Sequence, residues 1–309
     1  MAEQPPRLTD RPPAPPPRRT RRSHRFAPLA GLLLGLAGLV AIGWGVRTVA
    51  DTGSSAPETT QPTTTQAALP TLRIVFPEGF TREDMAGRIA AVNKIARDKR
   101  NLGTRLSPKA YLQLTKRGAL PPDFKDVKPP NLEGFLFPAT YVFTPKTTTR
   151  ELVAMQLEAF DEAWAKVDMR YAKSKNLTPY DVLIIASMIE KEVQVARERP
   201  LVAAVIYNRL KARMPLGIDA TIRYGFHIPP TQAILESQIE SNSPYNTRKI
   251  PGLPPTPIAN PGLASIQAAA HPAKVDYLYF VRKADCKSHF FTTSKRAFDN
   301  YPRTGLQCG

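Results

Sequence analysis

Residues 178–192 read TPYDVLIIASMIEKE, and this stretch predicts the central helix of the fold. Thr178 stands directly before Pro179, and Asp181 follows at the spacing of an N-terminal capping box with proline in the first turn. Residues 182–189 are apolar apart from Ser187, so most of the helix should be buried.

Glu190, near the end of this helix, is the candidate catalytic residue. On a helical wheel it shares the face of Ser187, whereas Glu192 lies about 200° away and should face solvent. A carboxyl among apolar side chains has a raised pKa and can donate a proton near neutral pH. A structural role is equally consistent with the pattern, with Glu190 paired to Lys191 or Arg197 at the edge of the core.

The flanking segments indicate an α+β fold. Residues 72–76 alternate as in a strand, Thr81 and Asp84 predict a second capping box, and 277–281 predict another strand. The Gly- and aromatic-rich segment 131–143 predicts a strand–turn–strand element, and the Pro/Gly-rich segment 252–262 an ordered loop. Further helices are expected at 82–97, 108–117, 148–167, 200–213 and 265–270.

The N-terminal part predicts a membrane anchor. Residues 1–25 hold seven Arg and two acidic residues and should be a disordered cytoplasmic tail. The uncharged run FAPLAGLLLGLAGLVAIGWGV predicts a transmembrane helix over 26–47, which places the rest outside the plasma membrane. A cleaved signal peptide is the alternative, but the run exceeds an ordinary signal core. A Thr/Pro-rich linker (48–70), a small strand–helix subdomain (71–130) and a catalytic domain (131–309) should follow.

Composition excludes several classes of site. Two Cys rule out a four-cysteine zinc site, and the four His are not at ligand spacing, so neither a metal nor a cofactor is expected. No phosphate-binding glycine loop and no nucleophile elbow is present. The net charge of +17 suits an anionic surface such as acidic lipid or cell-wall polymer, and nucleic acid is not expected because the basic tail is predicted to be cytoplasmic. Export makes a disulfide between Cys286 and Cys308 the expected state of the thiols.

Several motifs in one order resemble a known family. ASMIEKEVQVARERPLVAAVIYNRL (186–210), MPLGIDATIRYG (214–225), SPYNT (243–247), GLPPTPIANPG (252–262) and AAAHPAKVDYLYFV (268–281) are similar to the catalytic region of the MltG/YceG-like endolytic murein transglycosylases. IVFPEGFT (74–81) and LEGFLFPATYVF (132–143) resemble the family's upstream signatures. The resemblance implies a small, shortened LysM-like subdomain before a mixed α+β catalytic domain.

The resemblance also implies an activity. Such enzymes are lyases that cleave the MurNAc–GlcNAc β-1,4 bond of nascent glycan strands, form 1,6-anhydro ends and terminate strand elongation. Glu190 takes the place of the catalytic acid, and peptidoglycan, the membrane and peptidoglycan synthases are the implied partners. The residues expected to line the substrate groove are Ser187, Asp219, Thr221, Tyr224, Tyr245, Asn246, Thr247, Asn260 and His271.

Two other functions compete with the lyase. A muramidase would hydrolyse the same bond with a second carboxylate, for which Asp219 and Glu133 are the candidates. A wall-binding or division scaffold would keep the fold without catalysis, but the intact Glu190 motif argues against it.

Overall fold

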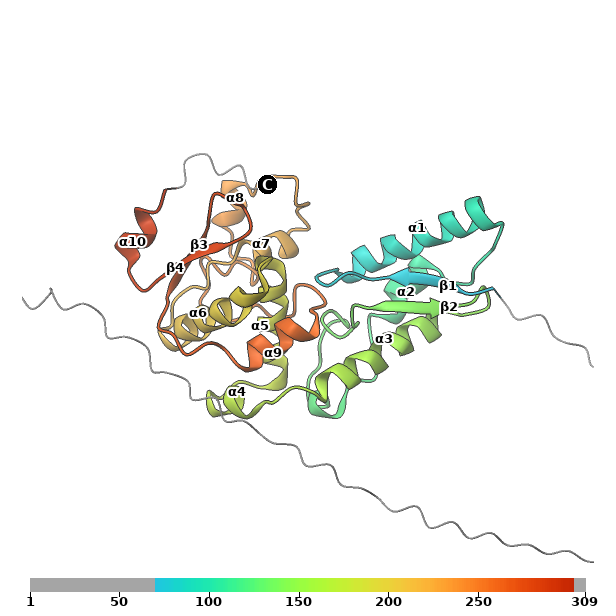
Figure 1. Ribbon diagram of the computed structural model, residues 1–309, viewed down its shortest axis with the longest axis horizontal. Coiled ribbons are helices and arrows are strands. Elements are labelled where there is room, and N and C mark those ends of the chain that lie inside the picture. Colours follow the sequence, from blue (N-terminus) through green and yellow to red (C-terminus); the bar gives the residue numbers. More distant parts are fainter. Residues whose placement is uncertain (1–69, 303–309) are drawn as a thin grey trace, which may run out of the picture. The chain divides into compact units, whose positions relative to one another are not determined.

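The computed structural model describes residues 70–302, which have mixed α+β structure (Figure 1). The predicted transmembrane segment 26–47 and most of the linker lie outside the described residues. Between residues 70 and 302, no helix has the length and apolar character that crossing a membrane requires.

The upstream part of the described chain is a two-stranded sheet with helices against it. Strand β1 (Leu72–Val75) pairs antiparallel with β2 (Thr140–Phe143), with Leu72 opposite Phe143. Helices α1 (Arg82–Arg100) and α2 (Pro108–Leu114) lie between the two strands in sequence, and α3 (Thr149–Trp164) follows β2. The predicted capping box is confirmed, because the Thr81 side chain accepts from the Asp84 backbone and the Asp84 side chain from the Thr81 backbone.

One prediction for this region is wrong. Residues 131–143 contribute one strand, β2, rather than two, and the partner of that strand is β1 from the beginning of the described chain. The boundary expected near residue 130 therefore falls within a packed region. Phe124 of the short helix η1 (Pro122–Phe124) packs across it, because its side chain is fully buried with its ring 5.0 Å from that of Phe135 and 4.7 Å from that of Trp164.

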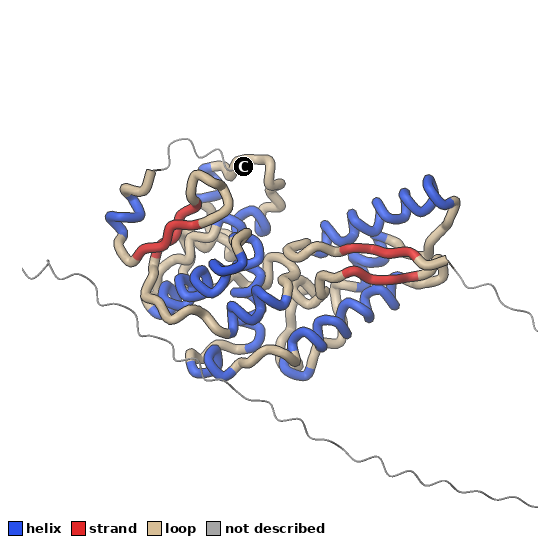
Figure 2. Tube along the Cα trace, in the orientation of Figure 1, coloured by secondary structure: helices blue, strands red, loops and turns tan. Residues whose placement is uncertain are grey.

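The second part of the chain is mostly helical, and α5 (Pro179–Glu192) lies at its centre (Figure 2). The predicted capping box of α5 is confirmed, and its residues 182–189 are all buried. Helix α5 packs against α6 (Arg199–Lys211), α7 (Asp219–Gly225) and α9 (Leu263–Ala270). The remaining elements are α4 (Arg170–Ser174), η2 (Ala196–Glu198), α8 (Glu236–Ile239), β3 (Tyr279–Arg282), its antiparallel partner β4 (His289–Thr292) and α10 (Lys295–Asp299).

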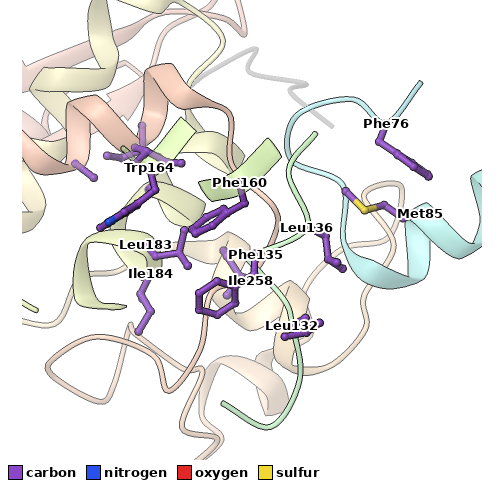
Figure 3. Packing of buried hydrophobic residues seen from close by; sticks show 14 of the residues in the cluster. Phe76, Met85, Leu132, Phe135, Leu136, Phe160, Trp164, Leu183, Ile184 and Ile258 are labelled. Atoms are coloured by element: carbon purple, nitrogen blue, oxygen red, sulfur yellow. The ribbon is translucent and has the colours of Figure 1, made fainter. Parts of the chain in front are cut away.

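The loop at 252–262 is ordered, as predicted, and it is packed into the core. Figure 3 shows its Ile258 close to Leu183 of α5 and to Phe135, which precedes β2. Gly134 faces the same loop with a φ of 91°, and a Cβ at that position would stand 2.6 Å from Pro257 Cγ. The loop therefore lies directly against one side of α5 and against the segment before β2.

Candidate active site

A cleft of about 1230 Å³ opens at the C-terminal end of α5. Its walls come from the end of α5, the start of α7, strand β3, helix α10 and the first turn of α1. A cleft of this size exceeds the usual volume of a small-molecule pocket and suits several linked sugars. The charged residues that line it are Glu83, Asp84, Lys191, Glu192, Arg209, Asp219, Arg223, Arg248, Arg282 and Lys295.

Glu192 is the acidic residue of α5 that lines this cleft. The expectation that it faces solvent is wrong, because the helix ends at Glu192 and the side chain is half-buried between α7 and β3. Burial raises the pKa of the Glu192 carboxyl, and the negative charge of Asp219 adds to the rise. Arg282 and a hydrogen bond from the Ala220 backbone act in the opposite direction on this pKa. A carboxyl whose protonated and ionised forms are both supported by its surroundings is suited to give and take back a proton.

Asp219, a predicted groove residue, also lines the cleft. It forms an ion pair with Arg248, whose Nη2 donates to Asp219 Oδ2 at 2.9 Å. Because Asp219 is the first residue of α7 and Arg248 follows the SPYNT segment, the pair joins two parts of the cleft wall. The Asp219 carboxylate is therefore held in place at the cleft wall.

Glu190 lies on a different face of α5 and does not line the cleft. Its Oε2 accepts a hydrogen bond from the Gly262 backbone N–H at 3.1 Å. Ser187, one turn earlier, accepts from the Ile258 backbone N–H at 3.0 Å, so the face that carries both side chains lies along the 258–262 loop. Glu190 also raises the pKa of Glu78, after the larger effect of partial burial. This environment is typical of a residue that fixes a loop to a helix.

Tyr224 lines the cleft, but its hydroxyl points to an interior carboxylate. The hydroxyl lies 3.3 Å from Glu133 Oε2, and Glu133 is 1% exposed. Glu133 also accepts from Asn260 Nδ2 at 2.7 Å and from the Arg82 backbone N–H at 3.2 Å. Burial raises the pKa of Glu133 to about 8, against the lowering effect of the Arg82 backbone hydrogen bond. Glu133 therefore supports the cleft from behind Tyr224 and does not itself line it.

Six other predicted groove residues are structural in this geometry. Five of them are at most 2% exposed and have their side-chain polar atoms hydrogen-bonded to other protein atoms: Ser187, Thr221, Asn246, Thr247 and Asn260. Thr221 and Thr247, for instance, have their hydroxyl oxygens 2.9 Å apart, and Thr247 also accepts from the Ile218 backbone N–H. The Tyr245 hydroxyl lies 2.8 Å from Thr256 Oγ1. These contacts hold the loops that form the cleft wall.

The remaining predicted residues lie elsewhere. His271 is exposed after α9, with its Nε2 3.7 Å from the Asp168 carboxylate, and does not line the cleft. Cys286 lies in the turn between β3 and β4, with a φ of 55°. Cys308 is outside the described residues, so the disulfide stays a prediction. Within residues 70–302, no cluster of His, Cys, Asp and Glu has the arrangement of a metal site.

Sequence reasoning missed Glu192, Arg248 and Arg282. A signal for Glu192 was present, because it is the second carboxylate of the same Glu-Lys-Glu run. The helical wheel separates the faces of Glu190 and Glu192 correctly, but it cannot show that α7 and β3 enclose the face of Glu192. No local pattern placed Arg248 or Arg282 near α5.

Comparison with known proteins gives the relationship of the chain. The model of the YceG-like family matches residues 51–303. The chain belongs to the YceG-like family. This YceG-like chain is 35% identical over 232 residues to an endolytic murein transglycosylase of Bacillus subtilis, covering 72% of the chain and 62% of that relative. It is 40% identical over 158 residues to an endolytic murein transglycosylase of Streptococcus pneumoniae, covering 48% of the chain and 28% of that relative.

A solved structure supports the same relationship. The crystal structure of a YceG-like protein from Listeria monocytogenes matches with a TM-score of 0.62 and 30% identity, covering 75% of this chain and 76% of that one. The YceG-like fold described above is therefore shared with an experimentally determined family member. The chain spans less than two thirds of the length of the Bacillus and Streptococcus relatives.

Proposed function

We propose that this protein is a peptidoglycan lytic transglycosylase, a lyase, and that Glu192 is its acid and base. The observation that carries the proposal is the half-buried Glu192 carboxyl, with a raised pKa, at the wall of a cleft large enough for a glycan strand. The names of the Bacillus and Streptococcus relatives, endolytic murein transglycosylase, support the reaction class.

One carboxyl is enough for this reaction. Protonated Glu192 gives its proton to the oxygen of the β-1,4 bond between MurNAc and GlcNAc, and the bond from C1 of MurNAc to that oxygen breaks. The C6 hydroxyl of the same MurNAc then bonds to C1, and its proton passes to the Glu192 carboxylate. The products are a new GlcNAc hydroxyl and a 1,6-anhydro-MurNAc end, no water is consumed, and Glu192 regains its proton.

The raised pKa of Glu192 suits both halves of the cycle. Burial and the charge of Asp219 raise the pKa of Glu192 and so favour the protonated carboxyl, which the first step requires. Arg282 and the Ala220 backbone stabilise the carboxylate that the second step requires. Glu190, the residue favoured by sequence, is instead covered by the 258–262 loop and bonded to Gly262. We therefore propose that Glu190 maintains the structure of the site.

A hydrolase is the competing reaction, and Asp219 is the carboxylate that would serve it. Asp219 lines the same cleft, whereas Glu133, the other candidate, is buried behind Tyr224. The Asp219 carboxylate is already occupied by the ion pair with Arg248, which favours the lyase.

Product analysis in labelled water separates the two reactions. Digestion of purified peptidoglycan in H₂¹⁸O should give ends that carry 1,6-anhydro-MurNAc and no ¹⁸O. Products that incorporate ¹⁸O, and that are no longer formed by an Asp219→Asn variant, would identify a hydrolase. The absence of any cleavage would favour a non-catalytic wall-binding scaffold.

We also propose that residues 26–47 anchor the protein in the plasma membrane, with residues 1–25 cytoplasmic and the folded unit outside. The uncharged run and the seven arginines before it support this topology. A reporter fused after Gly309 should be active only outside the membrane, and activity in the cytoplasm would contradict the proposal. Peptidoglycan synthases are the partners we propose for an anchored enzyme that acts on nascent strands.

A further inference from the structure

Arg282 differs from every other basic residue of the cleft. Six Lys and Arg side chains line the cleft, and five of them donate to protein acceptors. Arg248 binds Asp219, Lys295 binds Asp299, and Lys191 binds the Gly79 carbonyl. The other two bind backbone carbonyls: Arg209 those of Leu278 and Leu216, and Arg223 those of Pro229 and Gln232.

The Arg282 guanidinium has no hydrogen-bond acceptor or ion-pair partner among residues 70–302. It is the last residue of β3 and is half-buried at the cleft wall, within electrostatic reach of Glu192. A guanidinium presents a rigid fork of N–H donors that matches a carboxylate, and a half-buried fork without an acceptor is suited to receive one from a ligand. Glu192 does not fill this role, because no hydrogen bond or ion pair joins the two side chains.

The proposed reaction determines which carboxylate enters the cleft. A strand aligned for cleavage at Glu192 brings its MurNAc residue into the cleft, and the stem peptide is attached to that sugar. The glycan backbone itself is neutral, so the negative charge of the substrate lies on the stem peptide. A cation beside Glu192 that has no hydrogen-bond or ion-pair partner within residues 70–302 therefore meets the peptide rather than the sugars.

We propose that Arg282 is a binding residue for a carboxylate of the peptidoglycan stem peptide, so that the cleft selects strands that still carry their peptides. The proposal rests on the function proposed above, because it places the glycan strand in this cleft. It adds a charged subsite on the β3–β4 hairpin to the sugar-binding part of the cleft.

The test measures binding in a Glu192→Gln background, so that neither cleavage nor the charge of Glu192 contributes. The ligands are soluble glycan strands with intact stem peptides and the same strands after an amidase has removed the peptides and the lactyl carboxylates so exposed have been converted to primary amides. Calorimetry of the full chain should show that adding Arg282→Ala weakens binding of peptide-bearing strands by about tenfold, as for loss of a charge-assisted bond. Binding of peptide-free strands should not change. Arg282→Lys, which keeps the charge and loses the forked arrangement of N–H donors, should bind peptide-bearing strands with an affinity between those of the parent and Arg282→Ala.

Lys287→Ala is the matched control, because Lys287 is exposed on the same hairpin, carries the same charge and does not line the cleft. It should bind both ligands as the parent does. Equal affinities of the Arg282→Ala and parent proteins for peptide-bearing strands would overturn the proposal, and so would an equal loss for both ligands. If peptide-bearing strands bind through Arg282 but the active protein cleaves neither ligand, the proposed function fails while the subsite stands.

Discussion

Asn260 provides a direct test of whether the predicted groove residues bind sugar or hold the cleft wall. It is completely buried, and its Oδ1 accepts from the Gly134 and Leu136 backbone N–H groups at 2.9 and 3.0 Å. Its Nδ2 donates to the Phe80 carbonyl at 2.9 Å and to Glu133 Oε1 at 2.7 Å. One side chain thus joins the 258–262 loop to two segments more than a hundred residues away in sequence.

Replacing Asn260 with Ala removes all four hydrogen bonds. Each buried partner left unsatisfied costs about 1–3 kcal/mol, and water entering the small cavity recovers part of the total. We expect the free energy of unfolding to fall by about 4 kcal/mol, a loss at the upper end for a single substitution. Urea denaturation followed by tryptophan fluorescence measures this change, because Trp164 is buried.

Asn300→Ala is the control for Asn260→Ala. Asn300 is exposed after α10, so its replacement should change the free energy of unfolding by less than about 0.5 kcal/mol. The reasoning is refuted if Asn260→Ala unfolds at the same urea concentration as the parent and binds glycan strands more weakly. That result would return Asn260 to the sugar-binding role expected from sequence.

Two further predictions concern stability. In the folded protein the pKa of Glu133 is about 8, whereas its ordinary pKa is about 4.5. Between these two pH values the folded state therefore binds more protons than the unfolded state. The free energy of unfolding should therefore fall as the pH rises through this range, by up to about 1.4 kcal/mol per pH unit. Glu133→Gln should flatten this dependence. Equal slopes for the parent and the variant, measured by urea denaturation at several pH values, would contradict the prediction. Gly134→Ala should cost at least about 2 kcal/mol, because φ is positive and the new Cβ meets Pro257. Gly87→Ala in α1, with nothing within 4 Å of the added Cβ, should stabilise slightly, and thermal unfolding of the pair checks this contrast.

Local signals in the sequence predicted most of the helices. The capping boxes at Thr81 and Thr178 use contacts three residues apart, and the structure has helices that begin directly after them. Capping is a short-range interaction, so the sequence alone reveals it. The helix predicted at 148–167 is present as α3 for a similar reason, because helical periodicity is also local, and its Phe160 and Trp164 are buried.

Long-range pairing was beyond the sequence. Strand β1 pairs with a segment about 65 residues later, and no local pattern distinguishes that partner from a nearer one. The cleft could not be predicted for the same reason, because the walls that make Glu192 a cleft residue come from α7 and β3, which are distant from it in sequence. Polar residues in motifs were expected to touch substrate, but Asn246 and Thr247 satisfy backbone groups of the loops instead. Residue type alone does not separate these two roles.

The central claim is that Glu192, and not Glu190, is the acid and base of the cleft. The matched variants Glu192→Gln and Glu190→Gln make the same chemical change two residues apart on one helix, and the rate of release of 1,6-anhydro ends from purified peptidoglycan measures their effect. Glu192→Gln should lower this rate by about 10²–10⁴-fold with the fold intact, whereas Glu190→Gln should lower it less than about tenfold. A folded Glu190→Gln protein without activity, beside a Glu192→Gln protein of near-normal rate, would contradict the account.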